Sequence, residues 1–488
     1  MEKRPNIIVF VADQMRADAL GHLGNRAAIT PNLDKVAQTD GVSFRNAYCQ
    51  NNVCVPSRCS FLTGWYPHTR GHRTMHYLLE KDDPMLLKTL KNEGYHVLWL
   101  GRNDVIPADR PLDEYCHKYY PGHDGKPGLQ HFANKEWEDS YRGKPGDDTY
   151  YSFFAGKGEI NNPFIQYDWN CVNRALDFIE NWPADSETPF CIYITLIFPH
   201  PPYVCEEPWF SSVDRSLIED IRPVPDEWSE KPSMLKSIYE KQGLGSWNEE
   251  RLKELRATYH AMVSRLDHHY GMVMEALKER KFYDDTAVFM FSDHGDYTGD
   301  YGIVEKTQNT FENPVCNVPF IVKPPSTVNV QPRVSEALVE LVDLCATIAD
   351  MADFELPYTQ FGKSIVPALG GREEHRDAVF AEGGRIHGEP QATEAGHGPE
   401  SQYWPKISTQ CSEGPEHTKA VMVRTGQYKY VERLYEKSEL YDLSEDPCEL
   451  KNLIDAPQYK ELILQMKERI LKFYMETTDF VPAKRDKR

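Results

Sequence analysis

Four apolar stretches, each about as long as a strand, are the feature of this sequence that most restricts its fold. They cover residues 6–12, 94–100, 189–198 and 286–291. Apolar residues that follow one another without polar alternation are typical of strands buried on both faces of a sheet. Such strands occur in parallel sheets that helices cover on both sides. The four stretches therefore predict an α/β fold with a large, mostly parallel central sheet and helices on both faces.

Segments between these strands have the spacing of amphipathic helices. The longest covers residues 249–280, where apolar side chains recur every three or four positions. Further helices are predicted over residues 86–93, 168–180 and 335–352. Residues 105–170 lack clear periodicity and are rich in Gly, Pro, Tyr and charge, which predicts a long irregular insertion over the active-site face. Such insertions often determine specificity on a shared scaffold.

The composition shifts after Gly370-Gly371. Residues 377–383 and 420–435 are expected to form strands of a smaller sheet, separated by a loop rich in His, Gly and Pro over residues 383–418. A closing helix is expected over residues 459–474. We therefore predict a catalytic domain over residues 1–370 and a C-terminal α+β subdomain over residues 371–488.

Charge and length exclude several classes of protein. The chain has 488 residues and a net charge of −20, which argues against nucleic acid or an anionic membrane as the main partner. No segment is long and apolar enough to span a bilayer. The first residues lead straight into a strand without the apolar region of a signal peptide, and the eleven cysteines show no repeating spacing. We therefore expect reduced cysteines and a cytoplasmic location.

Polar side chains follow each of the four predicted strands. In open α/β sheets, ligands and catalytic groups gather at the carboxyl ends of the strands, so these side chains are candidates for one shared site. Two oxygen-bearing side chains after the first strand suit a hard cation. In chain order the candidates are Asp13 and Gln14, Arg102 and Asp104, His200, and Asp293 and His294.

The run Cys54-Val55-Pro56-Ser57-Arg58 suits the beginning of a helix. The amino end of a helix has free N–H groups and partial positive charge, which favour an anion or a thiolate at Cys54. Arg58 adds a planar, permanently charged group that matches tetrahedral oxyanions. The run predicts an oxyanion site with a reactive atom directed at it.

This run, followed by apolar residues and Thr63-Gly64, resembles the Cys-x-Pro-Ser/Ala-Arg motif of type I sulfatases in the alkaline phosphatase-like superfamily. Asp13-Gln14, the phrase Pro199-His200-Pro201-Pro202-Tyr203, Ser292-Asp293-His294-Gly295 and Lys306 resemble further motifs of that family in the same chain order. The resemblance spans most of the chain and implies hydrolysis of a sulfate ester.

The resemblance also implies roles for individual residues. A maturing enzyme would oxidise Cys54 to formylglycine, whose hydrated aldehyde is the nucleophile. One divalent ion, Ca²⁺ above all but also Mg²⁺ or Mn²⁺, would be held by Asp13, Gln14, Asp293, His294 and the oxidised Cys54. Arg58 and Lys306 would stabilise the anion, and His200 would protonate the leaving oxygen.

The sequence departs from the family at Gly101-Arg102-Asn103-Asp104, where Gly-Lys-x-His is usual. Arg102 still suits an oxyanion, whereas a carboxylate at position 104 donates a proton only when it is protonated. Two interpretations follow: Asp104 points away from the substrate, or the substrate brings a positive or hydroxyl-bearing group to meet it.

Two other functions fit the same residues. Phosphonate monoester hydrolases and phosphodiesterases of the superfamily share the metal motifs and the formylglycine, and they too lack the usual lysine and histidine. A non-catalytic anion-binding protein would keep Cys54 as a thiol. For a sulfatase we expect a small anionic substrate, a sulfated sugar or another organic sulfate, because Trp137, Tyr141 and Trp169 belong to the predicted insertions. A homo-oligomer is compatible with the basic end, residues 484–488, serving as an arm onto a neighbouring subunit.

Overall fold

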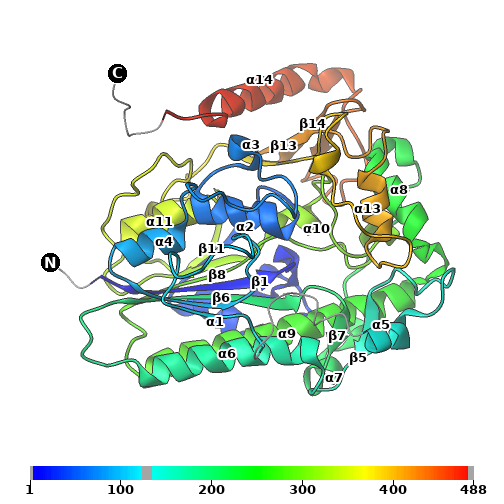
Figure 1. Ribbon diagram of the computed structural model, residues 1–488. Coiled ribbons are helices and arrows are strands. Elements are labelled where there is room, and N and C mark those ends of the chain that lie inside the picture. Colours follow the sequence, from blue (N-terminus) through cyan, green and yellow to red (C-terminus); the bar gives the residue numbers. More distant parts are fainter. Residues whose placement is uncertain (1–3, 124–134, 482–488) are drawn as a thin grey trace.

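The computed structural model describes residues 4–123 and 135–481, which form one large sheet, one small sheet and the helices around them (Figure 1). The large sheet has nine strands in the order β11-β2-β10-β8-β1-β6-β3-β4, with β9 paired to β2. Five of its pairings are parallel and three, those of β10 and β9, are antiparallel. The strands are β1 (Asn6–Asp13), β2 (Val42–Tyr48), β3 (His96–Gly101), β4 (Lys118–Tyr120), β6 (Phe190–Pro199), β8 (Thr286–Ser292), β9 (Asn317–Val318), β10 (Phe320–Lys323) and β11 (Arg333–Glu340).

The predicted mixed, mostly parallel sheet is confirmed. The four apolar stretches of the sequence are the neighbouring strands β8, β1, β6 and β3. Every residue of β1, β6 and β8 is buried, which explains why these strands read as continuous apolar runs.

Helices cover both faces of this sheet, as Figure 1 shows. On one face α1 (Pro31–Thr39), α6 (Pro163–Asn181) and α9 (Glu249–Glu279) share a core with Ile8 and Phe10 of β1. On the other face α2 (Cys54–Thr63), α4 (Leu86–Asn92) and α11 (Asp343–Met351) share a core with Val9 and Val11. The alternation of buried side chains along one strand thus builds two cores. Short helices complete the fold: α3 (Pro67–Arg70), α7 (Trp209–Ser212), α8 (Ser233–Gln242), α10 (Asn313–Cys316) and α12 (Val366–Leu369).

One helix prediction is wrong in part. Residues 335–352 contain the second half of β11 before α11 begins at Asp343. Ser335, Ala337 and Val339 are buried whereas Glu336 is exposed, so the side chains alternate with a period of two. That pattern belongs to an edge strand, and β11 pairs only with β2 among the described strands.

The small sheet contains β12 (Val379–Gly383), β13 (Ala420–Thr425), β14 (Tyr428–Arg433) and β15 (Glu439–Asp442), each antiparallel to the next. Its closing helix, α14 (Lys460–Thr477), stacks Phe473 on Phe380 of β12 at 4.0 Å between ring centroids. Because Val379 and Met422 also belong to the core around α2, the small sheet packs directly against the large one. The boundary at residue 370 stays a prediction.

Two connecting segments are more ordered than the sequence suggested. The predicted insertion holds β4, α5 (Lys135–Arg142) and β5 (Phe154–Lys157), and β5 pairs with β7 (Tyr203–Cys205). The predicted loop between β12 and β13 contains α13 (Trp404–Gln410). Among the described helices, none combines the length and the apolar character needed to cross a bilayer. The basic end at residues 484–488 lies outside the described residues.

Candidate active site

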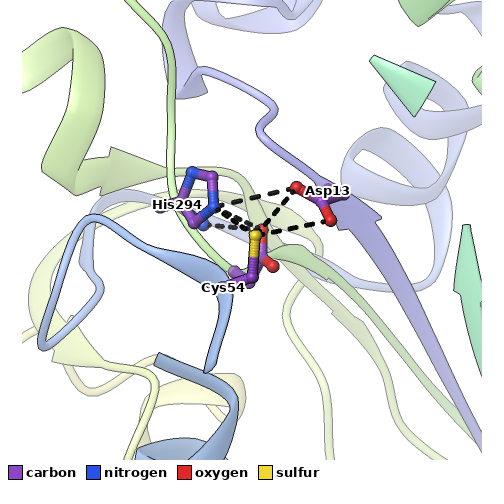
Figure 2. Close-up of side chains that lie close together, drawn as sticks. Asp13, Cys54 and His294 are labelled. Atoms are coloured by element: carbon purple, nitrogen blue, oxygen red, sulfur yellow. Dashed lines mark hydrogen bonds and ion pairs between the residues drawn. The ribbon is translucent and has the colours of Figure 1, made fainter. Parts of the chain in front are cut away.

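The candidate residues meet at the carboxyl ends of the central strands, where α2 begins. Asp13 is the last residue of β1, Asp293 follows β8, and Cys54 is the first residue of α2. One ligand atom from each of Asp13, Cys54, Asp293 and His294 lies within 4.8 Å of the others, and all four residues are buried. Figure 2 shows Asp13, Cys54 and His294 pointing toward one another from three different elements.

The imidazole of His294 is oriented toward this cluster. Its Nδ1 lies 3.0 Å from the carbonyl oxygen of Gly295 and donates to it, so Nε2 faces the other side chains. Nε2 is 3.2 Å from Cys54 Sγ, 3.7 Å from Asp13 Oδ1 and 3.6 Å from Asp293 Oδ1. Burial lowers the pKa of His294, which favours the neutral form that ligates metals.

Two buried arginines fix the carboxylates. Arg58 donates from Nε to Asp293 Oδ2 and from Nη2 to Asp13 Oδ2, both at 2.9 Å, and Arg102 donates from Nη1 to Asp13 Oδ2 at 2.5 Å. Burial alone would raise the pKa of Asp13, but the charges of Arg102 and Arg58 outweigh it and hold that pKa far below its usual value. The Oδ2 atoms are therefore occupied by guanidinium groups, while Oδ1 of each carboxylate faces His294.

Asp104 contacts both Arg58 and Arg102. Its Oδ2 lies 3.2 Å from Arg102 Nε and 3.6 Å from Arg58 Nη1. The described residues that line the neighbouring cavity include Arg102 but not Asp104. Of the two interpretations offered by the sequence, the geometry fits the one in which Asp104 points away from the substrate.

Gln14 connects the cluster to Lys306. Its backbone has a left-handed φ of 75°, and its N–H donates to Asp293 Oδ1 at 3.1 Å. The side-chain Oε1 accepts from Lys306 Nζ at 2.7 Å, and Nε2 donates to Asp296. Burial would lower the pKa of Lys306, but the carboxylates of Glu305 and Asp13 outweigh it and raise the pKa, so Lys306 is charged. Gln14 as a metal ligand stays a prediction.

The thiol of Cys54 is not activated. Burial, followed by the charge of Asp13, raises its pKa well above the ordinary value for cysteine. The expectation that the helix terminus favours a thiolate is therefore wrong here, because desolvation and the carboxylates outweigh the partial charge of the helix. Cys54 in this structure is a protonated thiol and a weak nucleophile.

A cavity of about 380 Å³ opens above Cys54. Arg102, His200 and Lys306 line it together with Cys54, so four of the predicted catalytic residues face one space. His200 donates from Nδ1 to the carbonyl oxygen of Pro201 at 2.5 Å. Burial and the charge of Lys306 hold the pKa of His200 well below its usual value, so its imidazole is neutral near pH 7.

The cavity is enclosed by side chains from the two connecting segments, which we call the wall. The wall consists of Trp137, Glu138 and Tyr141 of α5, and Glu394, His397, Gln402, Tyr403, Lys406 and Ile407 in and before α13. The hydroxyl of Tyr141 donates to Gln402 Oε1 at 3.3 Å, which ties the two segments together.

Sequence reasoning placed Trp169 near the site, and this is wrong. Its Nε1 donates to Glu206 at 3.0 Å, and its ring contacts His269 at 4.4 Å between centroids, away from the cavity lining. Conversely, sequence reasoning missed Tyr403 and Lys406. No motif or periodicity marks them, because they belong to a short helix inside a segment that reads as loop.

The residues present fit a divalent cation. Two carboxylate Oδ1 atoms, an imidazole nitrogen and the side chain of Cys54 converge within a buried space. A set that is rich in oxygen and contains one imidazole admits Ca²⁺, Mg²⁺ or Mn²⁺. The identity of the ion stays a prediction.

The known proteins to which this chain is similar include sulfatases. The family model for sulfatases matches residues 5–354, and the model described as N-sulphoglucosamine sulphohydrolase, C-terminal, matches residues 412–476. The chain is similar to an arylsulfatase of Clostridium perfringens, with 27% identity over 96% of this chain and 94% of that protein. It is also similar to a choline-sulfatase of Rhizobium meliloti, with 26% identity over 93% and 83% of the two chains.

Among solved structures, the phosphonate monoester hydrolase of Silicibacter pomeroyi superimposes with a TM-score of 0.74 over 97% of this chain and 96% of that chain, at 23% identity. At that identity the likeness shows the fold alone. The family match covers well over half of the sequence. The chain therefore belongs to the sulfatase family of the alkaline phosphatase-like superfamily, a family of sulfuric ester hydrolases.

Proposed function

We propose that this protein hydrolyses the sulfate ester of a small organic alcohol, with formylglycine made from Cys54 as the nucleophile and one divalent cation beside it. The observation that supports this most is the position of Cys54. It lies against Asp13 and His294 at the base of a cavity that also presents Arg102, His200 and Lys306.

The unreactive thiol is consistent with this assignment. The raised pKa keeps the thiol of Cys54 protonated. Residue 54 therefore becomes an effective nucleophile only after its side chain has been chemically converted. A hydrated aldehyde supplies one oxygen to attack sulfur and a second hydroxyl that lets the aldehyde reform as sulfate leaves. We propose that a sulfatase-maturing enzyme carries out the oxidation.

We assign the metal to Asp13, Gln14, Asp293, His294 and the oxidised Cys54, with Ca²⁺ as the first candidate. The cation supplies positive charge beside the nucleophile and the ester. Arg58 and Arg102 hold the carboxylates in place through Oδ2. Arg102 and Lys306 also face the cavity, where they stabilise charge on the ester oxygens.

We assign His200 to the leaving oxygen. Its Nδ1 proton is held by Pro201, so Nε2 is the atom that exchanges a proton with the alcohol. Its pKa is low in the described site, and the negative charge of an entering ester shifts that pKa upward.

For the substrate we propose a sulfated monosaccharide or a similarly small organic sulfate. The cavity of about 380 Å³ is near the small end of the range for ligand sites. The rings of Trp137, Tyr141 and Tyr403 offer flat apolar surfaces of the kind that sugar and aryl rings pack against. The C-terminal match is to a family that is named for an N-sulphoglucosamine sulphohydrolase.

A phosphonate monoester hydrolase or phosphodiesterase is the second candidate. It is supported by Arg102 and Asp104 in place of the family's usual residues and by the fold shared with a phosphonate monoester hydrolase. Assays in parallel on an aryl sulfate and on the matching aryl phosphonate monoester separate the two. We expect kcat/KM to be at least about tenfold higher for the sulfate, and a clear preference for the phosphonate would overturn the first proposal.

Cys54→Ala provides the control for this assay, since it removes the nucleophile while leaving the arginines in place. Peptide mass spectrometry over residue 54, after co-expression with a maturing enzyme, gives the second check. An unmodified thiol together with no turnover of either ester would favour a non-catalytic anion-binding protein.

A further inference from the structure

Glu305 is a buried carboxylate that lies between two lysines. Its Oε1 accepts from Lys306 Nζ at 2.9 Å, and its two oxygens lie 3.3 and 3.1 Å from Lys406 Nζ. Glu305 is 2% exposed, Lys306 4% and Lys406 8%, so solvent screens these charges weakly. The three side chains form a charged group that we call the lysine bridge.

The backbone holds Glu305 in a constrained position. Its φ of 66° is left-handed, and its N–H donates to the hydroxyl of Tyr203 at 2.9 Å. That hydroxyl in turn donates to Asp296, the residue that accepts from Gln14. Non-glycine residues in this backbone region persist where surrounding contacts determine them, and they are frequent at functional sites.

Lys406 reaches the bridge from a different part of the chain. It lies on α13, between two strands of the small sheet, and α13 is fixed to α8 through Thr409. Thr409 Oγ1 lies 2.9 Å from both Ser237 Oγ and Lys241 Nζ. Lys406 also lines the cavity beside Lys306, so the bridge borders the space that holds the ester.

The charges of the bridge add up to one net positive charge. With Lys306 alone, Glu305 would neutralise the lysine that faces the cavity and draw its ammonium away. With Lys406 present, Glu305 divides its hydrogen bonds between two ammonium groups, and the bridge keeps a net charge of +1 beside the anion. At the low effective dielectric of a buried site, one such charge changes anion affinity by about tenfold or more.

We infer that Lys406 is a positioning residue, which acts through Glu305 to keep Lys306 available and the bridge positively charged for the oxyanion of the substrate. The inference deepens the proposed function, since it assigns the C-terminal segment a part in binding the ester. Lys406 is not required to touch the reacting atoms.

Three variants test the charge balance directly, and a fourth serves as the control. Lys406→Met brings the bridge to zero charge, Glu305→Gln brings it to +2, and the double variant returns it to +1. The readout is the dissociation constant of inorganic sulfate, measured by calorimetry in calcium-containing buffer at constant ionic strength, with Cys54 unmodified. Lys241→Met serves as the matched control, because it removes an exposed lysine that contacts the same helix without reaching Glu305.

We expect Lys406→Met to weaken sulfate binding about tenfold and the double variant to return to within about threefold of the wild type. Glu305→Gln should bind at least as tightly as the wild type, and Lys241→Met should bind within about twofold of it. If Lys406 contributes only packing, adding Glu305→Gln to Lys406→Met should weaken sulfate binding further. A double variant that binds no better than Lys406→Met would overturn the inference, as would a wild-type protein that does not bind sulfate.

If Lys406→Met fails to fold, Lys406→Gln replaces it, because glutamine removes the charge and keeps a polar side chain beside Glu305. Sulfate binding by Lys406→Gln within about twofold of the wild type would overturn the inference. Binding of sulfate needs no formylglycine, so this result is independent of hydrolysis. If the variants bind sulfate in the expected order but the protein turns over no ester, the proposed function is wrong and the inference about Lys406 is kept. If the protein hydrolyses the ester but the variants do not bind sulfate in that order, only the inference about Lys406 is wrong.

Discussion

The floor of the cavity and its wall are built in opposite ways. By the floor we mean Cys54, which lines the cavity, together with the buried residues that meet behind it: Asp13, Arg58, Asp293 and His294. They lie at the ends of central strands and in the first turns of α2, and each is at most 1% exposed. The wall comes from α5 and the segment around α13, which are short pieces of structure within long connections. We therefore propose that the floor carries the chemistry, and that the wall contributes the choice of alcohol and, through Lys406, part of the binding of the ester.

The largest effect is expected from the floor. Asp13→Asn removes the charge that pairs with both arginines, and with it the proposed metal ligand, so we expect kcat/KM for an aryl sulfate to fall at least about a thousandfold. Calcium binding measured by calorimetry should be lost in the same variant. Asp109→Asn, at an exposed position in the insertion, is the control and should change neither quantity. Activity within tenfold of the wild type would show that the floor does not hold the chemistry.

An intermediate effect is expected at His200, where floor and wall meet. The pKa of His200 lies well below its usual value, so its protonated fraction rises as pH falls. If the protonated form donates to the leaving oxygen, kcat for esters of weakly acidic alcohols should fall as pH rises from about 5 to 8.

The matching variant is His200→Gln. It should slow esters of weakly acidic alcohols about a hundredfold and 4-nitrophenyl sulfate less than about tenfold, because the nitrophenolate leaves without a proton. Equal losses for both kinds of ester would assign His200 to positioning instead.

The smallest effect is expected in the wall. Trp137→Ala removes a ring that lines the cavity, so KM for a ring-bearing ester should rise about tenfold while kcat stays within about twofold. Trp169→Phe is the matched control, since Trp169 packs against His269 and leaves the cavity untouched. It should leave both kinetic constants unchanged and cost about 1 kcal/mol of unfolding free energy for the lost bond to Glu206, measured by urea denaturation. A large fall in kcat for Trp137→Ala would break the division between floor and wall.

The central sheet could be predicted from the sequence because β1, β6 and β8 are buried along their whole length and therefore consist of continuous runs of mostly apolar residues. The sequence also brought Asp13 and Asp293 to one place, since the carboxyl ends of neighbouring parallel strands meet at one edge of a sheet. Cys54 was placed with them only through the resemblance to the sulfatase motif. The sheet could be read from local runs of apolar residues, and the shared strand-end site from the polar residues that follow those runs.

The wall could not be predicted in the same way. Tyr403 and Lys406 acquire their positions from contacts across the fold, such as the pair formed by Lys406 and Glu305, about a hundred residues apart in the chain. Protonation states were also missed. The raised pKa of Cys54 and the lowered pKa of His200 depend on burial and on neighbours that come from other elements.

The connection that carries α13 leaves the small sheet at Gly383 and returns at Ala420, and these two residues are paired with each other in adjacent antiparallel strands. Its two ends are therefore already side by side, so the span between them can lengthen, shorten or be exchanged without altering the register of either sheet. Grafting the corresponding span from a relative with another preference would thus be a way to test whether this connection sets the preference for the alcohol. The lysine at position 406 would be the one residue that such an exchange has to keep.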